Sequence, residues 1–121
     1  MSIHHTISYI EFSTVRISDT KEFFTEIFGW YFTDYGDDYT SFSEAGVDGG
    51  FFSAGSQPTR PPSAALIVLY SEDLETTLGR VKNAGCIISK DIFSYPGGRR
   101  FHFIEPGGNE LAVCSEDNDN A

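Results

Sequence analysis

Apolar and polar residues alternate near the start of the chain, and this alternation indicates a β-strand with one buried face. Tyr9 and Glu11 alternate with Ile10 and Phe12, and a period of two is typical of extended chain. We therefore predict a strand over residues 6–14.

A helical pattern follows this strand. Ser18 or Asp19 is placed to cap the start of a helix and Gly29 to end it, because these residue types suit the two ends of a helix. Three short strands are then predicted within residues 30–54, which are rich in aromatic residues and broken by glycine turns. The buried helix face is expected to contain Phe23, Phe24, Ile27 and Phe28.

The second half of the chain repeats this order of elements. Residues 55–63 contain three prolines and predict a connector, because proline interrupts both helices and strands. A strand is predicted over 64–70, then a helix from Asp73 to Ala84 that Gly85 ends. Three strands are predicted over 86–92, 99–105 and 109–115, with a Pro-Gly-Gly-Asn turn between the last two.

The duplicated order of strand, helix and three strands predicts an α+β fold made of two βαβββ modules. Neither module can cover its own sheet, so we expect the modules to pair, with curved antiparallel sheets around a small-molecule cavity and helices outside. We expect a single domain at 5–116, with module 1 at 6–54, module 2 at 64–116 and a solvated acidic tail at 117–121. A ferredoxin-like domain is the alternative, although its usual plan has fewer strands after each helix.

The charge of the chain excludes several kinds of partner. Eighteen acidic side chains against 8 basic ones give a formal net charge of −10, which repels nucleic acids and anionic lipid surfaces. No apolar run is long enough to span a membrane and no signal peptide is evident, so we expect a cytoplasmic protein. Cys86 and Cys114 are expected to be buried free thiols, because their spacing suits neither a disulfide framework nor a zinc site.

Three segments resemble a known family. YIEF, KEFFTEIFGW and RRFHFIEPGGNELAV are similar to the signature regions of the vicinal-oxygen-chelate superfamily, which includes glyoxalases, bleomycin resistance proteins and dioxygenases. The similarity extends over nearly the whole chain, although Glu105 replaces the Asp that the family usually has before its Pro-x-Gly-Asn turn. It implies a small organic ligand between two modules and a homodimer.

The same resemblance implies where a metal ion would bind. Residue counts place the family's ligand positions at Tyr9, Leu66 and Ala112. Leu and Ala have no donor atoms and a neutral phenol is a poor ligand. We therefore expect neither a metal ion nor another cofactor, which argues against a glyoxalase or an extradiol dioxygenase.

Other side chains are expected to line the cavity instead. Inward orientation of Tyr9 and Ala112 places Glu11, Glu110 and Cys114 on the same side. The resemblance adds Arg100 and His102, and turns Phe101 and Phe103 toward the helices. The predicted ligand-binding residues are Tyr9, Glu11, Arg100, His102 and Glu110, with Arg100 holding an anionic or carbonyl group and with Glu11 and His102 as candidate catalytic residues.

Several alternatives remain open at this point. Arg100 and Glu110 can simply pair across neighbouring strands, or Glu11, His102 and Glu110 can form a different metal site. Our leading hypothesis is a metal-independent small-molecule-binding protein of a sequestering or resistance type. The alternatives are a lyase, isomerase or dioxygenase that uses a non-standard metal site or Glu/His acid–base chemistry, and a non-catalytic interaction domain.

Overall fold

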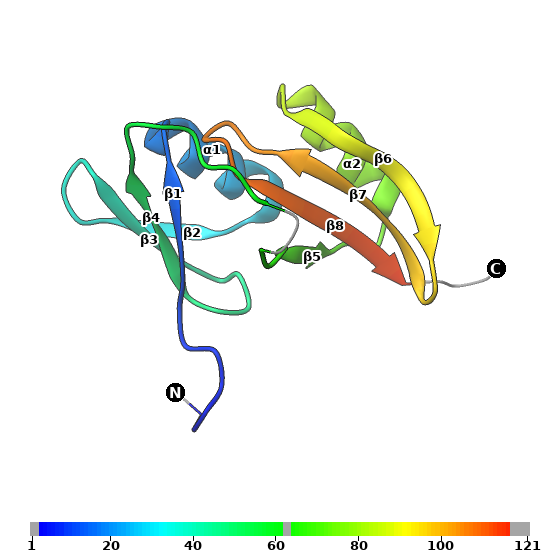
Figure 1. The fold of residues 1–121 in the computed structure, drawn as a ribbon, viewed down its shortest axis with the longest axis horizontal. Helices are drawn as coiled ribbons and strands as arrows, with labels where there is room; N and C mark the ends of the chain where they lie inside the picture. The colour runs from blue at the N-terminus through cyan, green and yellow to red at the C-terminus, as the bar shows by residue number, and fades with distance from the viewer. Residues whose placement is uncertain (1–2, 62–63, 117–121) are drawn as a thin grey trace.

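Each half of the chain folds as a strand, a helix and three strands. The computed structural model describes residues 3–61 and 64–116, and Figure 1 shows the two halves side by side. The first module contains β1 (Ile10–Thr14), α1 (Ile17–Phe28), β2 (Tyr31–Asp34), β3 (Tyr39–Ser43) and β4 (Gly49–Ser53). The second contains β5 (Val68–Tyr70), α2 (Leu74–Asn83), β6 (Ile87–Tyr95), β7 (Gly98–Ile104) and β8 (Glu110–Glu116). The predicted α+β fold with two βαβββ modules is confirmed, and the ferredoxin-like alternative is wrong.

The two sheets have the same topology. The strand order is β1-β4-β3-β2 in one and β5-β8-β7-β6 in the other. In each module the first strand pairs in parallel with the last, and the other pairs are antiparallel. Each sheet is therefore mixed, and its first strand lies at an edge.

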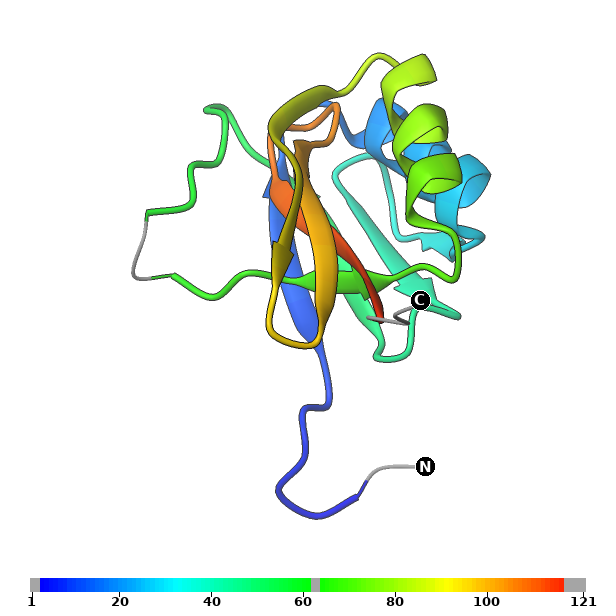
Figure 2. The same cartoon turned by 90° about the vertical axis from the view of Figure 1, so that its right-hand side faces the viewer.

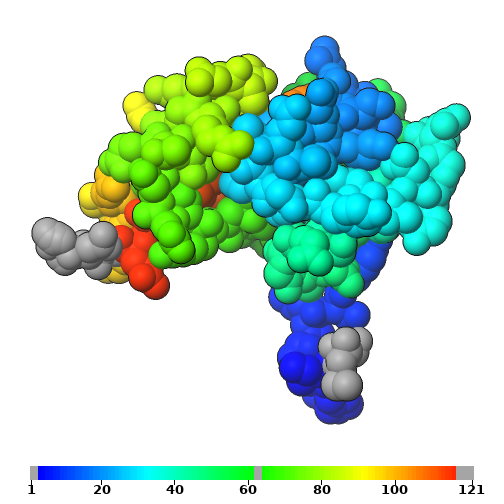
Figure 3. Space-filling view, turned by 180° about the vertical axis from the view of Figure 1, so that it is seen from behind, coloured from blue at the N-terminus to red at the C-terminus, as the bar shows by residue number. Residues whose placement is uncertain are grey.

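The sheets form one layer and the helices another, as Figure 2 shows. The view from behind in Figure 3 has α1 and α2 next to each other over the back of the sheets. Between the layers lies one aromatic core that crosses the module boundary. Phe23 and Phe28 of α1 contact Phe103 of β7, with ring centroids 5.6 and 6.1 Å apart. Trp30 is buried and stacks on Phe24, with ring centroids 4.4 Å apart.

Two strands are shorter than their sequence patterns predict. The first strand starts at Ile10 instead of residue 6, because its ladder partner β4 starts at Gly49, opposite Ile10. The side chain of Ile7, left outside the sheet, is 72% exposed. In the second module, β5 comprises only Val68–Tyr70 of the predicted 64–70. Alternation alone does not show where a partner strand begins.

The helix ends follow the predictions at three of four places. Gly29 ends α1 in the left-handed conformation, with φ 75°, and Gly85 follows α2 with φ 88°. Asp73 caps α2 by accepting a hydrogen bond from the Thr76 amide at 3.2 Å. The prediction for the start of α1 is wrong, because the helix begins at Ile17, after Arg16, and neither Ser18 nor Asp19 caps it.

A buried carboxylate joins the two modules. Glu105, 2% exposed, accepts hydrogen bonds from the Thr20 hydroxyl at 2.8 Å and from the amides of Gly107 and Asn109 at 2.8 and 3.1 Å. The Asn109 side chain also donates to Glu105 and to the Ser13 carbonyl, both at 2.7 Å. A buried charge needs such a full set of partners, so the turn before β8 is fixed against the end of β1 and the start of α1.

Both cysteines are free thiols, as predicted, but each is half-buried where full burial was expected. Burial raises the pKa of the Cys86 thiol to about 12, and the charge of Glu105 adds to this rise. Across the described part of the chain, no helix has the length and apolar character needed to cross a membrane. The predicted acidic tail at 117–121 and residues 62–63 of the connector lie outside the described residues.

Candidate functional site

Among the residues that the structure describes, no helix or further sheet covers the side of both sheets away from α1 and α2 (Figure 2). We call it the bare face. It exposes large apolar or aromatic side chains from both modules, among them Tyr9 at 46%, Phe52 at 41% and Tyr70 at 56%. Phe42 of β3 and Phe51 of β4 are buried in the core, whereas the side chain of Phe52 belongs to this face.

On the bare face of module 1, two phenols and a carboxylate form one group. The Tyr39 hydroxyl donates to Glu11 Oε2 at 2.9 Å and is also hydrogen-bonded to the Tyr9 hydroxyl. A Cβ at Gly50 would lie 2.2 and 2.7 Å from the two hydroxyls, so only glycine leaves room for them. Burial raises the pKa of Tyr39 far above its ordinary value, and the hydrogen bonds with Tyr9 and Glu11 raise it further.

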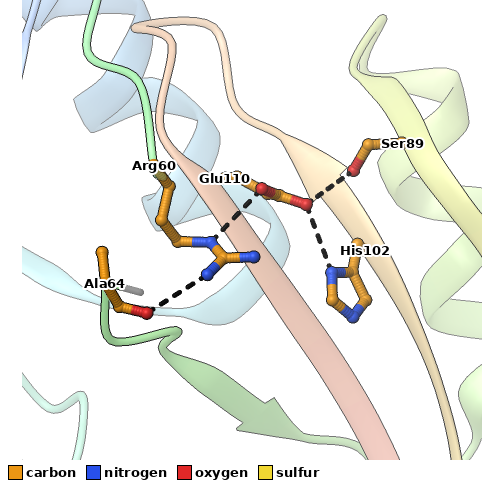
Figure 4. Close-up of polar contacts among 5 residues, drawn as sticks. All are labelled: Arg60, Ala64, Ser89, His102 and Glu110. Carbon is orange, nitrogen blue, oxygen red and sulfur yellow. Dashed lines mark hydrogen bonds and ion pairs between the residues drawn. The ribbon is translucent and has the colours of Figure 1, made fainter. Parts of the chain in front are cut away.

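On the bare face of module 2, the Glu110 carboxylate is the centre of a second group, drawn in Figure 4. Arg60 of the connector donates from Nε to Oε1 at 3.3 Å, and its Nη1 donates to the Ala64 carbonyl at 3.3 Å. Ser89 donates to Oε2 at 3.2 Å, and His102 Nδ1 lies 3.2 Å from the same oxygen.

The contact with Glu110 determines the tautomer of His102. The His102 side chain is 3% exposed, and burial lowers its pKa; Arg100 and Lys90 add to this effect, whereas Glu110 opposes it. A neutral imidazole has one N–H, and the hydrogen bond to the carboxylate places it on Nδ1. Nε2 is then an acceptor, and it has no hydrogen-bond partner among the described residues.

The pKa of Glu110 reflects the same contacts. Partial burial by itself would raise the pKa of this carboxyl. The hydrogen bonds from His102 and Ser89 and the charge of Arg60 outweigh burial, so the pKa is lowered. Glu110 is consequently ionised at neutral pH and accepts hydrogen bonds only.

Arg100 lies on the same face of β7 as His102, two residues away. In the β7–β8 ladder it lies opposite Cys114, and Glu110 lies opposite Ile104, so the alternative in which Arg100 pairs with Glu110 is wrong; Arg60 pairs with Glu110 instead. The Arg100 guanidinium lies over the rings of Phe93 and Tyr95, 5.4 and 5.2 Å from their centroids. Its Nε is buried without a hydrogen-bond partner in the described part of the chain.

A cleft of about 330 Å³ joins the two groups at the module boundary. It brings together Glu11 of β1 and Glu110 of β8, with Arg60 of the connector beside them. Tyr9 and His102 adjoin the cleft only through their contacts with other residues. Its remaining lining residues are Phe12, Ser13, Pro58, Thr59, Ala64, Ala65, Ile67, Gly108 and Asn109.

Comparison with known proteins identifies the family. Residues 3–113 match the sequence model of the glyoxalase/bleomycin resistance protein/dioxygenase superfamily. The chain belongs to this superfamily. A comparison with curated proteins gave no match.

Solved structures of the superfamily have the same fold at low sequence identity. The genomically encoded fosfomycin resistance protein FosX of Listeria monocytogenes is 19% identical with a TM-score of 0.78, over 93% of this chain and 94% of that one. A FosX mutant solved with Mn(II) and 1S,2S-dihydroxypropylphosphonic acid is 18% identical with a TM-score of 0.76, over 93% and 90%. A glyoxalase-related enzyme from Fulvimarina pelagi is 15% identical with a TM-score of 0.75, over 93% and 88%.

The positions expected to hold the superfamily's metal ion do not fit one in this chain. Ala112 is fully buried and Leu66 half-buried, and neither has a donor atom. The Tyr9 hydroxyl is hydrogen-bonded to Tyr39, and none of the three residues lines the cleft. Glu11 also takes no part in the contact between His102 and Glu110, and the described residues contain no group of three or more His, Cys, Asp or Glu placed to hold a metal ion.

The sequence did not predict three residues of the site. Arg60 lies in a proline-rich connector, Ser89 is an isolated hydroxyl, and Tyr39 is one of many aromatic residues within 30–54. The Gly-Gly pair at the start of β4 was the available signal for Tyr39, because a glycine inside a strand often marks close approach of another group.

Proposed function

We propose that this member of the superfamily binds a small organic molecule at the module boundary without a resident metal ion, as a sequestering or resistance-type protein. The observation that supports this is the position of Glu11 and Glu110, which come from different modules and line one cleft with Arg60. A site that combines few polar groups with an apolar wall is typical of small-molecule binding.

The groups around the cleft indicate how a ligand would be held. Among the described residues, Arg60 donates to one Glu110 oxygen and to the Ala64 carbonyl, and we propose that its remaining N–H groups hold a carbonyl or an acid group of the ligand. Glu11 and Glu110 accept hydrogen bonds from the ligand, and Pro58, Ala64 and Ala65 of the cleft lining supply apolar contact. We propose that Tyr9, Arg100 and His102 act on the part of the ligand that extends over the bare face.

The relatives support this class of ligand. FosX is a fosfomycin resistance protein, and its mutant complex contains a phosphonic acid. We carry over only the idea of a small organic acid. The manganese of that complex is not carried over, because Tyr9, Leu66 and Ala112 do not offer a suitable set of metal ligands.

A thermal-shift screen of small organic acids and dicarbonyl compounds tests the proposal. We expect a ligand that raises the melting temperature, and weaker binding after Arg60→Gln or Glu11→Gln. Arg99→Gln is the matched control, because Arg99 binds Glu75 of α2 and not the cleft. Stoichiometric binding of added zinc, manganese, nickel or iron, with stabilisation of the fold, would contradict the metal-free proposal.

A second candidate is an enzyme with acid–base chemistry. The observation that favours it is the hydrogen bond between His102 and Glu110, which leaves Nε2 as a base. Glu11 and His102 were the candidate catalytic residues from the sequence, and in this proposal Glu110 orients His102. For an enzyme, His102→Asn should abolish turnover with little change in KM, whereas for a binding protein it changes affinity alone.

We also propose a homodimer in the cytoplasm. The aromatic residues exposed on the bare face suit contact with a second copy, because large exposed apolar patches mark interaction surfaces. Sizing by light scattering tests the dimer, and Tyr70→Glu on the bare face should weaken it. Fractionation of cells tests the location.

A further inference from the structure

His102 is a buried polar group with an unmet hydrogen bond. The side chain is 3% exposed and Nε2 has no partner within residues 3–61 and 64–116. Leaving such a group unpaired costs free energy, and native proteins rarely do so without a reason. A partner outside the protein chain is the simplest way to satisfy it.

The chemistry of that partner follows from the tautomer. Nδ1 donates to Glu110, so Nε2 accepts, and the missing partner must donate a hydrogen bond. The charged groups facing this ring are Glu110 of β8, Arg100 of β7 and Lys90 of β6. Two of the three are cations, so a cationic donor such as an amine is disfavoured here. A neutral hydroxyl meets the requirement.

Arg100 has the complementary unmet bond on the same side of β7. Its buried Nε is a donor without an acceptor, and residues two apart on a strand lie on the same face. The Phe93 ring contacts both groups, 5.8 Å from the His102 ring centroid and 5.4 Å from the Arg100 guanidinium carbon. One acceptor and one cationic donor therefore border the same aromatic ring.

We infer that the ligand is a small organic anion that also carries a hydroxyl group, with its hydroxyl donating to His102 Nε2 and its anionic oxygen accepting from Arg100. This inference rests on the function proposed above and extends it to a subsite beside the cleft. Arg60 and His102 reach the Glu110 carboxylate from opposite sides in Figure 4, so Glu110 lies between the cleft and the subsite.

Entry to the subsite requires a side chain to move, because both orphan atoms are covered. Arg100 is held over Phe93 and Tyr95 by ring contacts and by no ion pair among the described residues. Such a contact contributes roughly 0.5 to 1 kcal/mol at a partly exposed site. The guanidinium can therefore leave the rings when a ligand anion offers it a stronger partner.

Calorimetry with matched acids tests the inference. The probes are glycolate with acetate, lactate with propionate, and malate with succinate, where each pair differs by one hydroxyl. We expect the hydroxy acid of at least one pair to bind roughly tenfold tighter, the size of one good hydrogen bond. His102→Phe should remove this preference, Arg100→Gln should weaken both members of the pair, and Arg99→Gln should change neither.

A second measurement uses the unaltered protein, so that it does not depend on folding of His102→Phe. Nitrogen NMR of isotope-labelled histidine should show Nδ1 protonated, and the preferred hydroxy acid should shift the Nε2 signal. Any one of four results overturns the inference. These are equal binding within every pair, a preference that persists in His102→Phe, a protonated Nε2, and an Nε2 signal that no hydroxy acid shifts. The first two results leave the proposed function standing, whereas failure of the wider screen, including the Arg60 and Glu11 variants, would defeat the proposed function itself.

Discussion

The Glu105 carboxylate accepts a hydrogen bond from the Thr20 hydroxyl at 2.8 Å, across 85 residues of sequence. Glu105→Gln replaces one acceptor oxygen by an NH₂ group that faces donors, and we expect a loss of roughly 2–4 kcal/mol in the free energy of unfolding. Urea denaturation measures this loss. Glu22→Gln, at an exposed position of α1, is the control, and we expect it to change stability by less than about 0.5 kcal/mol. Equal stability of the two variants would show that the buried carboxylate does not hold the modules together.

Two glycine-to-alanine changes should have opposite effects. A Cβ at Gly107 would lie 1.8 and 2.4 Å from the hydroxyl oxygens of Thr14 and Thr20, which are hydrogen-bonded to each other. We expect Gly107→Ala to destabilise the protein by roughly 1–3 kcal/mol. A Cβ at Gly79 of α2 meets nothing within 4 Å, so Gly79→Ala should stabilise by up to about 1 kcal/mol. Thermal unfolding of both variants measures the two effects, and the same sign for both would contradict the prediction.

The stability of the protein should fall on acidification because of His102 and Glu110. Folding lowers both pKa values, so at an acidic pH the unfolded chain binds more protons than the folded protein. Acidification therefore favours the unfolded state and lowers the free energy of unfolding. The contribution of His102 is lost as pH falls below the ordinary value of 6.5, and that of Glu110 as pH falls below 4.5. Urea midpoints measured from about pH 7.5 to 5 should fall less in His102→Phe than in the unaltered protein. His4→Asn controls for the loss of one imidazole, and an unchanged slope in His102→Phe would contradict the assignment.

Tyr39 should ionise at a higher pH than an ordinary tyrosine. Burial and the hydrogen bonds with Tyr9 and Glu11 raise its pKa, so Glu11→Gln should lower that pKa by removing a nearby carboxylate. Gly50→Ala should disturb the same group by pushing on both phenols. Alkaline titration by near-ultraviolet absorbance follows these changes, with Tyr35→Phe on an exposed turn as the control. A tyrosine absorbance titration that is unaffected by Glu11→Gln would show that the group does not form.

Sequence reasoning succeeded where the signal was local. Gly29 and Gly85 end helices as predicted, and Phe23 and Phe24 of the predicted helix face are core residues. It failed at the start of β1, because the end of a ladder depends on a partner strand that lies elsewhere in the sequence.

The candidate site was likewise predictable only in part. Alternation along the last strand gave the face on which Glu110 lies, since successive side chains point to opposite sides of a sheet, and the resemblance to the superfamily gave the face of Arg100 and His102. It did not give their partners. Glu110 binds Arg60, which is 50 residues away, and no local pattern marks such a contact.

The order of elements and the glycines that end both helices follow from the amino-acid sequence, because short-range periodicity and side-chain chemistry determine them. The poor or missing metal donors at Tyr9, Leu66 and Ala112 follow from it through the resemblance to the superfamily. Only the tertiary structure decided three features. These are the register of the strands, the pairing of Glu110 with Arg60, and the burial of His102 with one ring nitrogen unpaired among the described residues. These features depend on which segments far apart in the sequence meet, and no short-range pattern of residues marks such contacts.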